Sequence, residues 1–223
     1  PVIAGTAQAG TKETIKLTKY AEEAGADGAM VVLPYYHTPT KEGMYEHYKE
    51  IAEAVDIGIM LYNNPDVSGA WVDPELMSRI SKIGNIVAVK DNTSSASYFY
   101  QITRAIDQED MSLICGLGYC NYVAKGSFGS GESRWKGFVN AIGNFAPSIV
   151  YGLYEAVENR DFDKADEVLA TMDKFWNLVG KFMSKRETTS ILPPIWQTNY
   201  MYQSVGKAAM DIAGLNGGPM RLP

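Results

Sequence analysis

The sequence predicts an α/β protein built from repeated strand–helix units, and two features of its 223 residues support this class. Short apolar runs rich in β-branched residues begin roughly 26 to 30 residues apart, which is about the length of a strand and its crossover helix. The runs are almost continuously apolar, as in Ala29–Leu33 and Ile86–Val89. Strands of a parallel sheet that is covered on both faces have this pattern.

Predicted strands and helices alternate along the whole chain. Six strands are expected to begin near Val2, Gly28, Gly58, Asn85, Met111 and Gly137. Helix starts are indicated by capping residues and prolines at Thr40, Asp73-Pro74, Ser95 and Ala146-Pro147. A long helix from about Phe162 and a last helix over Ser204–Ala213 follow, and their apolar stripes at helical spacing indicate helix packing.

This alternation fits two architectures, a doubly wound open sheet and a (β/α)8 barrel. An open sheet needs about five or six strands and a barrel needs eight units, whereas the chain supplies six. The first strand–helix turn, Gly5–Gly10, lacks the G-x-G-x-x-G spacing of a dinucleotide site. Composition and periodicity therefore predict the α/β class and leave the two architectures open.

The composition excludes several kinds of partner. A formal net charge of −6 gives no electrostatic footprint for nucleic acid, and no apolar run approaches the roughly 20 residues that span a membrane. Two cysteines, Cys115 and Cys120, suit a reducing compartment, so a cytoplasmic location is expected. The two histidines, His37 and His47, lack the spacing of a metal motif, and no catalytic metal is expected.

Functional groups of parallel α/β proteins gather at the carboxyl ends of the strands, and Lys90 lies at one of these ends. This lysine closes the apolar run Ile86–Val89, so its side chain starts inside apolar packing. It either extends into solvent or remains partly desolvated. A desolvated amine has a lowered pKa and can attack a carbonyl group to form a Schiff base.

Tyrosines end the two preceding strands. Tyr62 is either a rim residue with its hydroxyl in water or a proton shuttle, because a phenol both donates and accepts hydrogen bonds. Tyr35 and Tyr36 follow the strand before it, and paired tyrosines also occur at ordinary surfaces and interfaces.

Several strand ends occur in an order and spacing that resembles the dihydrodipicolinate synthase/N-acetylneuraminate lyase family. They are Pro1–Thr6, Pro34–Thr40, Leu61–Pro65 and Ile86–Asp91, and the segments Gly143–Pro147 and Gly218–Pro223 fit as well. The combination of Tyr-Asn-x-Pro with a lysine at the end of the next strand is specific, and the resemblance covers essentially the whole chain.

The resemblance implies a (β/α)8 TIM barrel with extra C-terminal helices. The six strands would then be strands three to eight, and the first two βα units, with their carboxylate-binding turn, would lie upstream of Pro1. We expect a partial barrel over residues 1–147, and the last barrel helix with a C-terminal helical region over residues 148–223. Without the upstream units, the chain is expected neither to form a closed barrel nor to convert substrate.

The resemblance also implies a class I mechanism, in which a lysine forms an imine with pyruvate or another 2-oxo acid and no other cofactor is needed. Lys90 would be this lysine, Tyr62 the general acid/base, and Tyr36 a proton-relay tyrosine that reaches a neighbouring subunit's site. A homo-oligomer, either a dimer or a tetramer, is therefore expected. The backbone around Val139 and Asn140 would line the substrate.

Three further positions are expected at the substrate: Asn92, Val67 and Gly118. Val67 stands where dihydrodipicolinate synthases carry an arginine, and valine cannot pair with a second substrate carboxylate. Gly118 lies in a loop where family members often place acids that bind substrate hydroxyls.

Three functions follow from these observations. The first is aldol cleavage, aldol condensation or dehydration of a 2-keto-3-deoxy sugar acid by a metal-independent lyase. The second is 4-hydroxy-tetrahydrodipicolinate (dihydrodipicolinate) synthase, which Val67 disfavours. The third is a non-catalytic sensor or assembly member of the family, which the pairing of Lys90 with Tyr62 disfavours and the absence of the carboxylate-binding turn favours.

Overall fold

The structure is a computed structural model that describes residues 1–93, 95–107, 109–117, 135–183 and 202–220. Expected site residue Gly118 lies outside these residues. The chain forms two compact units, Pro1–Val139 and Asn140–Pro223. The candidate active site is built from strand ends of the first unit.

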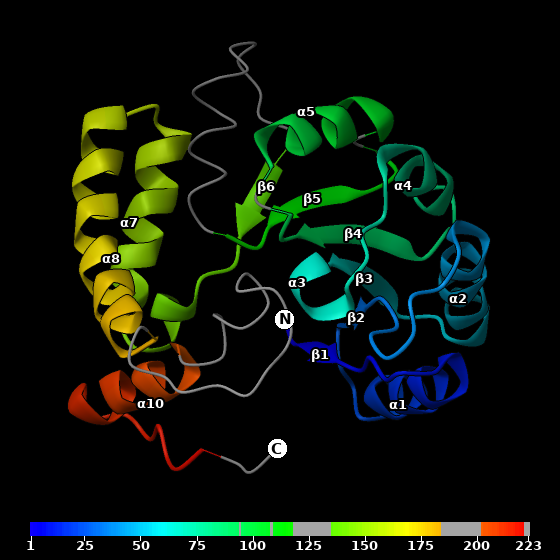
Figure 1. Cartoon of the computed structure of the whole chain (residues 1–223), viewed down its shortest axis with the longest axis horizontal. Coiled ribbons are helices and arrows are strands. Elements are labelled where there is room, and N and C mark those ends of the chain that lie inside the picture. Colours follow the sequence, from blue (N-terminus) through cyan, green and yellow to red (C-terminus); the bar gives the residue numbers. More distant parts are fainter. Residues whose placement is uncertain (94, 108, 118–134, 184–201, 221–223) are drawn as a thin grey trace. The chain divides into compact units, whose positions relative to one another are not determined.

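The first unit alternates strands and helices in the predicted order (Figure 1). Its elements are β1 (Ile3–Gly5), α1 (Thr11–Glu23), β2 (Gly28–Val32), α2 (Lys41–Ala54), β3 (Gly58–Asn63), α3 (Pro65–Ser68), α4 (Pro74–Ile80), β4 (Ile86–Asp91), α5 (Ala96–Ala105), β5 (Ser112–Cys115) and β6 (Trp135–Phe138). The second unit contains the 3₁₀ helix η1 (Ala141–Asn144), α7 (Pro147–Glu158), α8 (Phe162–Met183) and α10 (Tyr202–Ile212).

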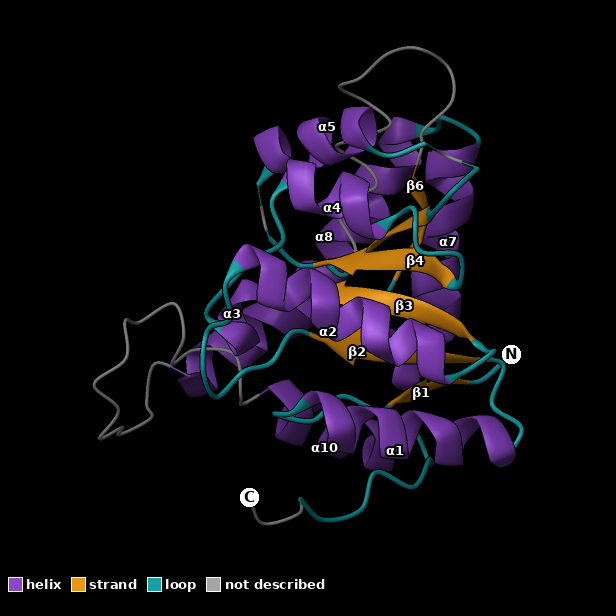
Figure 2. Cartoon of the chain, turned by 90° about the vertical axis from the view of Figure 1, so that its right-hand side faces the viewer, coloured by secondary structure: helices purple, strands orange, loops and turns teal. Residues whose placement is uncertain are grey.

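The described strands form one parallel sheet in the order β1-β2-β3-β4-β5-β6. Helices α1, α2, α4 and α5 lie along one side of this sheet, as Figures 1 and 2 show. The predicted α/β class with repeated parallel βα units is therefore confirmed. Each strand begins within a few residues of its predicted start, because β-branched runs mark buried parallel strands.

The predicted burial of both strand faces is only partial in β3. Its residues alternate between half-buried and buried positions. Side chains that point toward the helices have almost no exposed surface: Val31, Leu33, Ile59, Leu61, Val89 and Leu113. The other face carries half-buried side chains, among them Met30, Met60, Tyr62 and Lys90. The candidate functional side chains Tyr62 and Lys90 therefore share the face opposite the described helices of the first unit.

One irregularity interrupts the pairing of β3 with β4. Ile59 pairs with Ile86 but Met60 pairs with Ala88, so Val87 is an extra residue in β4. Val87 packs directly over Gly58, where a Cβ atom would approach its Cγ2 to 2.9 Å. A Cβ atom at this position would force the Val87 side chain to move, so glycine lets the bulged residue pack closely over β3.

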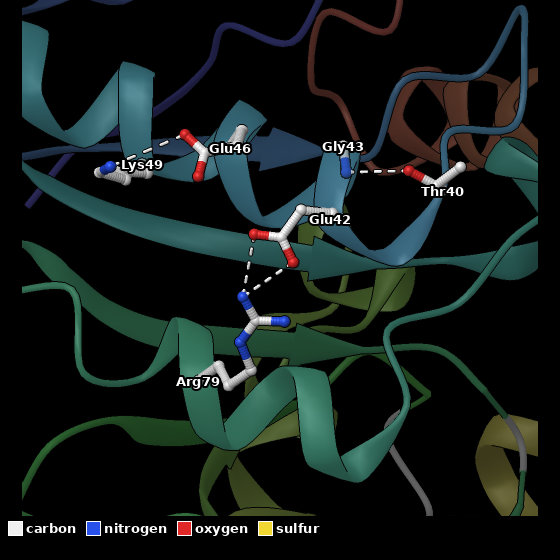
Figure 3. A network of polar contacts seen from close by, with 6 residues as sticks. All are labelled: Thr40, Glu42, Gly43, Glu46, Lys49 and Arg79. Carbon is white, nitrogen blue, oxygen red and sulfur yellow. Dashed lines mark hydrogen bonds and ion pairs between the residues drawn. The ribbon is translucent and has the colours of Figure 1, made fainter.

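Three helices begin at the N-capping residues that the sequence predicts. The side chains of Thr40, Asp73 and Ser95 each accept a hydrogen bond from a backbone N–H in the first turn of the helix that follows. Figure 3 shows the Thr40 cap, at 3.1 Å from the Gly43 nitrogen. Such caps are each worth about 0.5–2 kcal/mol.

Polar side chains join α2 to α4 at the surface. Arg79 Nη2 lies 3.1 and 3.0 Å from the two carboxylate oxygens of Glu42 (Figure 3), and its guanidinium stacks over the Tyr45 ring at 4.5 Å. Because both charged groups are largely exposed, the ion pair is worth no more than about 1 kcal/mol. Apolar packing beneath these helices supplies most of the stability of the unit.

The second unit is helical in its described residues. In α8, Ala165, Met172 and Val179 recur every seven residues and are buried, which agrees with the predicted packing stripe. Trp176 and Phe182 of the same predicted stripe remain substantially exposed. In the described part of the chain, no helix is long and apolar enough to cross a membrane.

His47 gives the fold a predictable pH dependence. Burial lowers the pKa of this histidine from 6.5 to about 4, while the unfolded chain titrates near 6.5. The unfolded state binds more protons between these values, so the free energy of unfolding should fall by up to roughly 3 kcal/mol as the pH drops from 6.5 to 4. Denaturant unfolding at several pH values measures this loss.

Substitution His47→Gln should flatten the fall in stability between pH 6.5 and pH 4, because the titrating group is removed. The exposed histidine His37 provides the control, and His37→Gln should leave the profile unchanged. An unchanged profile in the His47 variant would contradict this account.

Candidate active site

Two of the predicted residues, Tyr62 and Lys90, lie against each other at the carboxyl ends of neighbouring strands. They are register partners in the parallel pairing of β3 with β4. The Lys90 amine lies over the face of the Tyr62 ring, with its Nζ atom 4.0 Å from the ring centroid. A cation in this position is attracted by the electron-rich face of the ring.

Lys90 has the environment of a partly desolvated amine. Its side chain is half-buried on the sheet face opposite the helices. The pKa of the amine is lowered from 10.5 because burial penalises the charged form. A larger fraction of Lys90 is therefore neutral at a given pH, and the neutral amine is the form that attacks a carbonyl carbon.

The hydroxyl group of Tyr62 accepts a hydrogen bond from a neighbouring side chain. Asn64 Nδ2 donates a hydrogen bond to the Tyr62 hydroxyl oxygen at 2.8 Å. Asn64 precedes Pro65, the first residue of α3, so this short helix and the strand end share one turn. The hydroxyl oxygen accepts this bond, so the Asn64 amide fixes the position of the phenol group at the strand end.

Two buried amide oxygens lie at the same strand ends. In the described residues, Asn64 Oδ1 and Asn92 Oδ1 are buried and have no hydrogen-bond partner. The Asn92 amide packs over Gly116 at the end of β5, where a Cβ atom would meet its Oδ1 at 1.6 Å. Gly116 is thus needed for the close approach of Asn92, and an acceptor without a donor is costly when buried.

The other predicted site residues have separate environments. Tyr36 is 78% exposed in the loop after β2 and makes an edge contact with His37. Val67, 44% exposed, lies in α3, and its backbone nitrogen donates to the Asn64 carbonyl. Val139 follows β6 and donates its backbone N–H to the Cys115 carbonyl at 2.8 Å. Asn140 belongs to the second unit, where its side chain caps η1.

Sequence reasoning assigned no role to three polar residues beside the predicted pair. They are Asn63, Asn64 and Asp91, and each is buried. The sequence does contain a clue to these residues, in the segments Tyr62–Pro65 and Lys90–Asp91. Polar residues that continue an apolar strand are buried with it and must find hydrogen-bond partners.

In the described residues, no cluster of three or more His, Cys, Asp or Glu side chains could hold a metal ion.

The chain matches the model of the dihydrodipicolinate synthetase family over residues 1–223. It belongs to this family. It is also 35% identical over 223 residues to the 4-hydroxy-tetrahydrodipicolinate synthase of Syntrophus aciditrophicus (strain SB). This match covers 100% of this chain and 68% of the Syntrophus protein. The predicted family and the predicted enzyme class, a lyase of the aldolase type, are confirmed at this level.

Solved structures of the family share the fold. Dihydrodipicolinate synthase DapA-2 of Bacillus anthracis superposes with a TM-score of 0.79 at 30% identity, over 100% of this chain and 68% of that chain. KD(P)GA of T. tenax superposes with a TM-score of 0.76 over 100% of this chain and 69% of that chain. Its 23% identity shows the fold alone. The chain thus spans about two thirds of these TIM-barrel relatives.

We predict that Lys90 titrates below the ordinary lysine value of 10.5, because burial disfavours its charged form. Competitive labelling of amines over a pH series, read by peptide mass spectrometry, measures the midpoint. Lys82 is the control, since its ion pair with Asp110 raises its pKa. A midpoint for Lys90 at or above that of Lys82 would contradict the proposed desolvation.

Proposed function

We propose that the protein is a class I lyase in which Lys90 forms a Schiff base with pyruvate or another 2-oxo acid. The observation that carries this proposal is the half-buried Lys90 amine over the ring of Tyr62, at adjacent strand ends. In parallel α/β folds, catalytic groups lie at the carboxyl ends of the strands. The family to which the chain belongs supports the same chemistry.

The first step is addition of the neutral Lys90 Nζ to the C2 carbonyl carbon of the 2-oxo acid. The carbonyl oxygen takes up a proton, and loss of water then forms the iminium bond. Tyr62 is placed to give and take these protons, since Asn64 Nδ2 holds its hydroxyl oxygen at 2.8 Å. Asn64 is therefore a positioning residue for Tyr62.

The iminium then acts as the electron sink. In aldol cleavage, Tyr62 takes the C4 hydroxyl proton, the C3–C4 bond breaks, its electron pair passes to the iminium, and the aldehyde leaves. In condensation or dehydration, Tyr62 takes the C3 proton instead, and in dehydration the C4 hydroxyl then leaves as water. The imine is covalent and needs no metal ion to stabilise the carbanion. Tyr62 returns a proton when water hydrolyses the imine and frees Lys90.

We propose a 2-keto-3-deoxy sugar acid as the substrate class. The support is Val67, an apolar and partly exposed side chain in α3, where dihydrodipicolinate synthases carry arginine by the resemblance. Valine offers no donor to a second carboxylate, whereas arginine binds one through two hydrogen bonds. Substrate hydroxyls would then be recognised by other groups of the first unit, among which we propose Asn92 and the backbone of Val139.

The second candidate is 4-hydroxy-tetrahydrodipicolinate synthase. It is favoured by the names of the curated relatives, among them the Syntrophus synthase at 35% identity. A non-catalytic role finds less support, because a desolvated amine beside an oriented phenol is costly to maintain without a chemical use. The homo-oligomer remains a prediction, and the high exposure of Tyr36 leaves it accessible to a neighbouring subunit.

Borohydride trapping tests the imine. Incubation of the full-length protein with pyruvate and borohydride should add one reduced pyruvate unit, which intact mass spectrometry detects and peptide mapping places on Lys90. Substitution Lys90→Ala should abolish the adduct, because the only nucleophile in the proposed step is removed. Lys82→Ala is the matched control and should trap at the wild-type rate. Absence of the wild-type adduct would refute the proposed function.

Substrate competition tests the role of Val67. We expect kcat/KM for a 2-keto-3-deoxy sugar acid to exceed that for aspartate semialdehyde with pyruvate by about 10-fold or more, given the missing bidentate partner. Val67→Arg should shift this ratio toward the semialdehyde, while Val67→Leu should not. Faster turnover of the semialdehyde by the wild-type protein would favour the synthase instead.

A further inference from the structure

The residues that directly follow Tyr62 and Lys90 are Asn63 and Asp91, and they are also register partners. Because successive strand residues point to opposite faces, their side chains lie on the helix-covered side of the sheet. Both are fully buried there. Asn63 Nδ2 donates a hydrogen bond to Asp91 Oδ1 at 2.8 Å, which joins the ends of β3 and β4 through side chains as well as backbone.

Asn63 has its orientation fixed by the adjoining helix layer. Its Oδ1 atom accepts from the backbone N–H of Val72 at 2.9 Å, and its Nδ2 atom also donates to the Tyr98 hydroxyl at 2.8 Å. Tyr98 in α5 donates in turn to the Val72 carbonyl at 2.5 Å. The Asn63 amide therefore cannot flip without placing a donor against a donor.

Asp91 is surrounded by donors on its other oxygen. Oδ2 accepts from the backbone nitrogen of Thr93 at 3.0 Å and from its hydroxyl at 2.7 Å. Burial raises the pKa of Asp91 to about 6, so the carboxylate is charged at neutral pH and can accept all of these bonds. Asparagine and aspartate at these two positions thus form a pair of defined polarity, with the donor on β3 and the acceptor on β4.

We propose that Asn63 and Asp91 are positioning residues, whose hydrogen bond, anchored by Tyr98, holds the ends of β3 and β4 in the register that sets Tyr62 against Lys90. The inference rests on the proposed function, since it concerns the geometry of imine formation. Tyr62 and Lys90 immediately precede Asn63 and Asp91 on the same two strands, so a relative shift of the strand ends moves both. A displacement of about 1 Å in a reacting pair can cost about 100-fold in rate.

The polarity of the pair provides a specific test. Asn63→Asp places two carboxylates face to face. Asp91→Asn places an amide NH₂ against either Asn63 Nδ2 or the Thr93 backbone N–H, so one contact is lost in either orientation. In the double variant Asn63→Asp/Asp91→Asn, the amide on β4 donates to the carboxylate on β3, and the cross-strand hydrogen bond is restored with reversed polarity. Tyr98 keeps its contact with position 63 by turning its O–H from the Val72 carbonyl to the new carboxylate.

The experiment measures the rate of borohydride-trapped pyruvate adduct formation on Lys90 in the full-length protein. We expect each single variant to trap at least about 10-fold more slowly than the wild type, and the double variant to recover to within about 3-fold. Recovery by the exchange is not expected from two residues that merely contribute separately to stability. Thermal unfolding of the same samples reports the fraction of folded protein.

Two conservative tyrosine variants keep the test decisive if a single exchange fails to fold. Tyr98→Phe removes the hydroxyl that anchors Asn63, while Tyr48→Phe removes a comparable buried hydroxyl that donates to the Val31 carbonyl at 2.9 Å on β2. Tyr98→Phe should slow trapping, and Tyr48→Phe should trap at the wild-type rate after a similar loss of thermal stability.

Two outcomes contradict this inference without contradicting the proposed function. The first is trapping at the wild-type rate by both single variants, and the second is a folded double variant that traps pyruvate no faster than the single variants do. Equal trapping by the Tyr98 and Tyr48 variants also counts against it. A wild-type protein that traps no pyruvate overturns the proposed function, and this inference with it.

Discussion

Consecutive side chains of a parallel strand point to opposite faces, and in the described residues of the first unit the helices lie along one of those faces (Figures 1 and 2). The consequence is clearest in β3 and β4. Asn63 and Asp91 face the helix layer, where burial forces them into hydrogen bonds. Tyr62 and Lys90 face the other side, where they are half-buried and in contact with each other. A structural pair and a chemical pair therefore alternate along the same two strands.

Burial disfavours the charged form of both Asp91 and Lys90, but the two groups have different partners. The carboxylate of Asp91 loses its hydration but gains three hydrogen bonds from Asn63 and Thr93, so a charged acceptor is retained inside the helix layer. The Lys90 amine loses hydration in exchange for an aromatic ring, which compensates the charge less fully. Its pKa falls as a result. Burial thus shifts both groups toward the neutral form, raising the pKa of Asp91 to about 6 and lowering that of Lys90.

Several site features were predictable because they depend on local sequence. Lys90 and Tyr62 end apolar runs, and the ends of parallel strands gather at one edge of the sheet whatever the details of packing. The caps at Thr40 and Asp73 were predictable for the same local reason. Asn64 was not, because its contact with the Tyr62 hydroxyl depends on how α3 turns after the strand. The Asn63–Asp91–Tyr98 network was also missed, since it joins residues of three separate elements.

The amino-acid sequence by itself determined the α/β class, the order of the strands, the resemblance to the family and the residue types at each strand end. Only the tertiary structure decided which of those residues meet. Ile59 pairs with Ile86, and an unbroken ladder would carry Tyr62 opposite Val89. The extra residue Val87, packed over Gly58, advances β4 by one position and brings Lys90 opposite Tyr62 instead. A shift of one residue exchanges the two faces of a strand, and this bulge arises from packing between strands that local patterns do not encode.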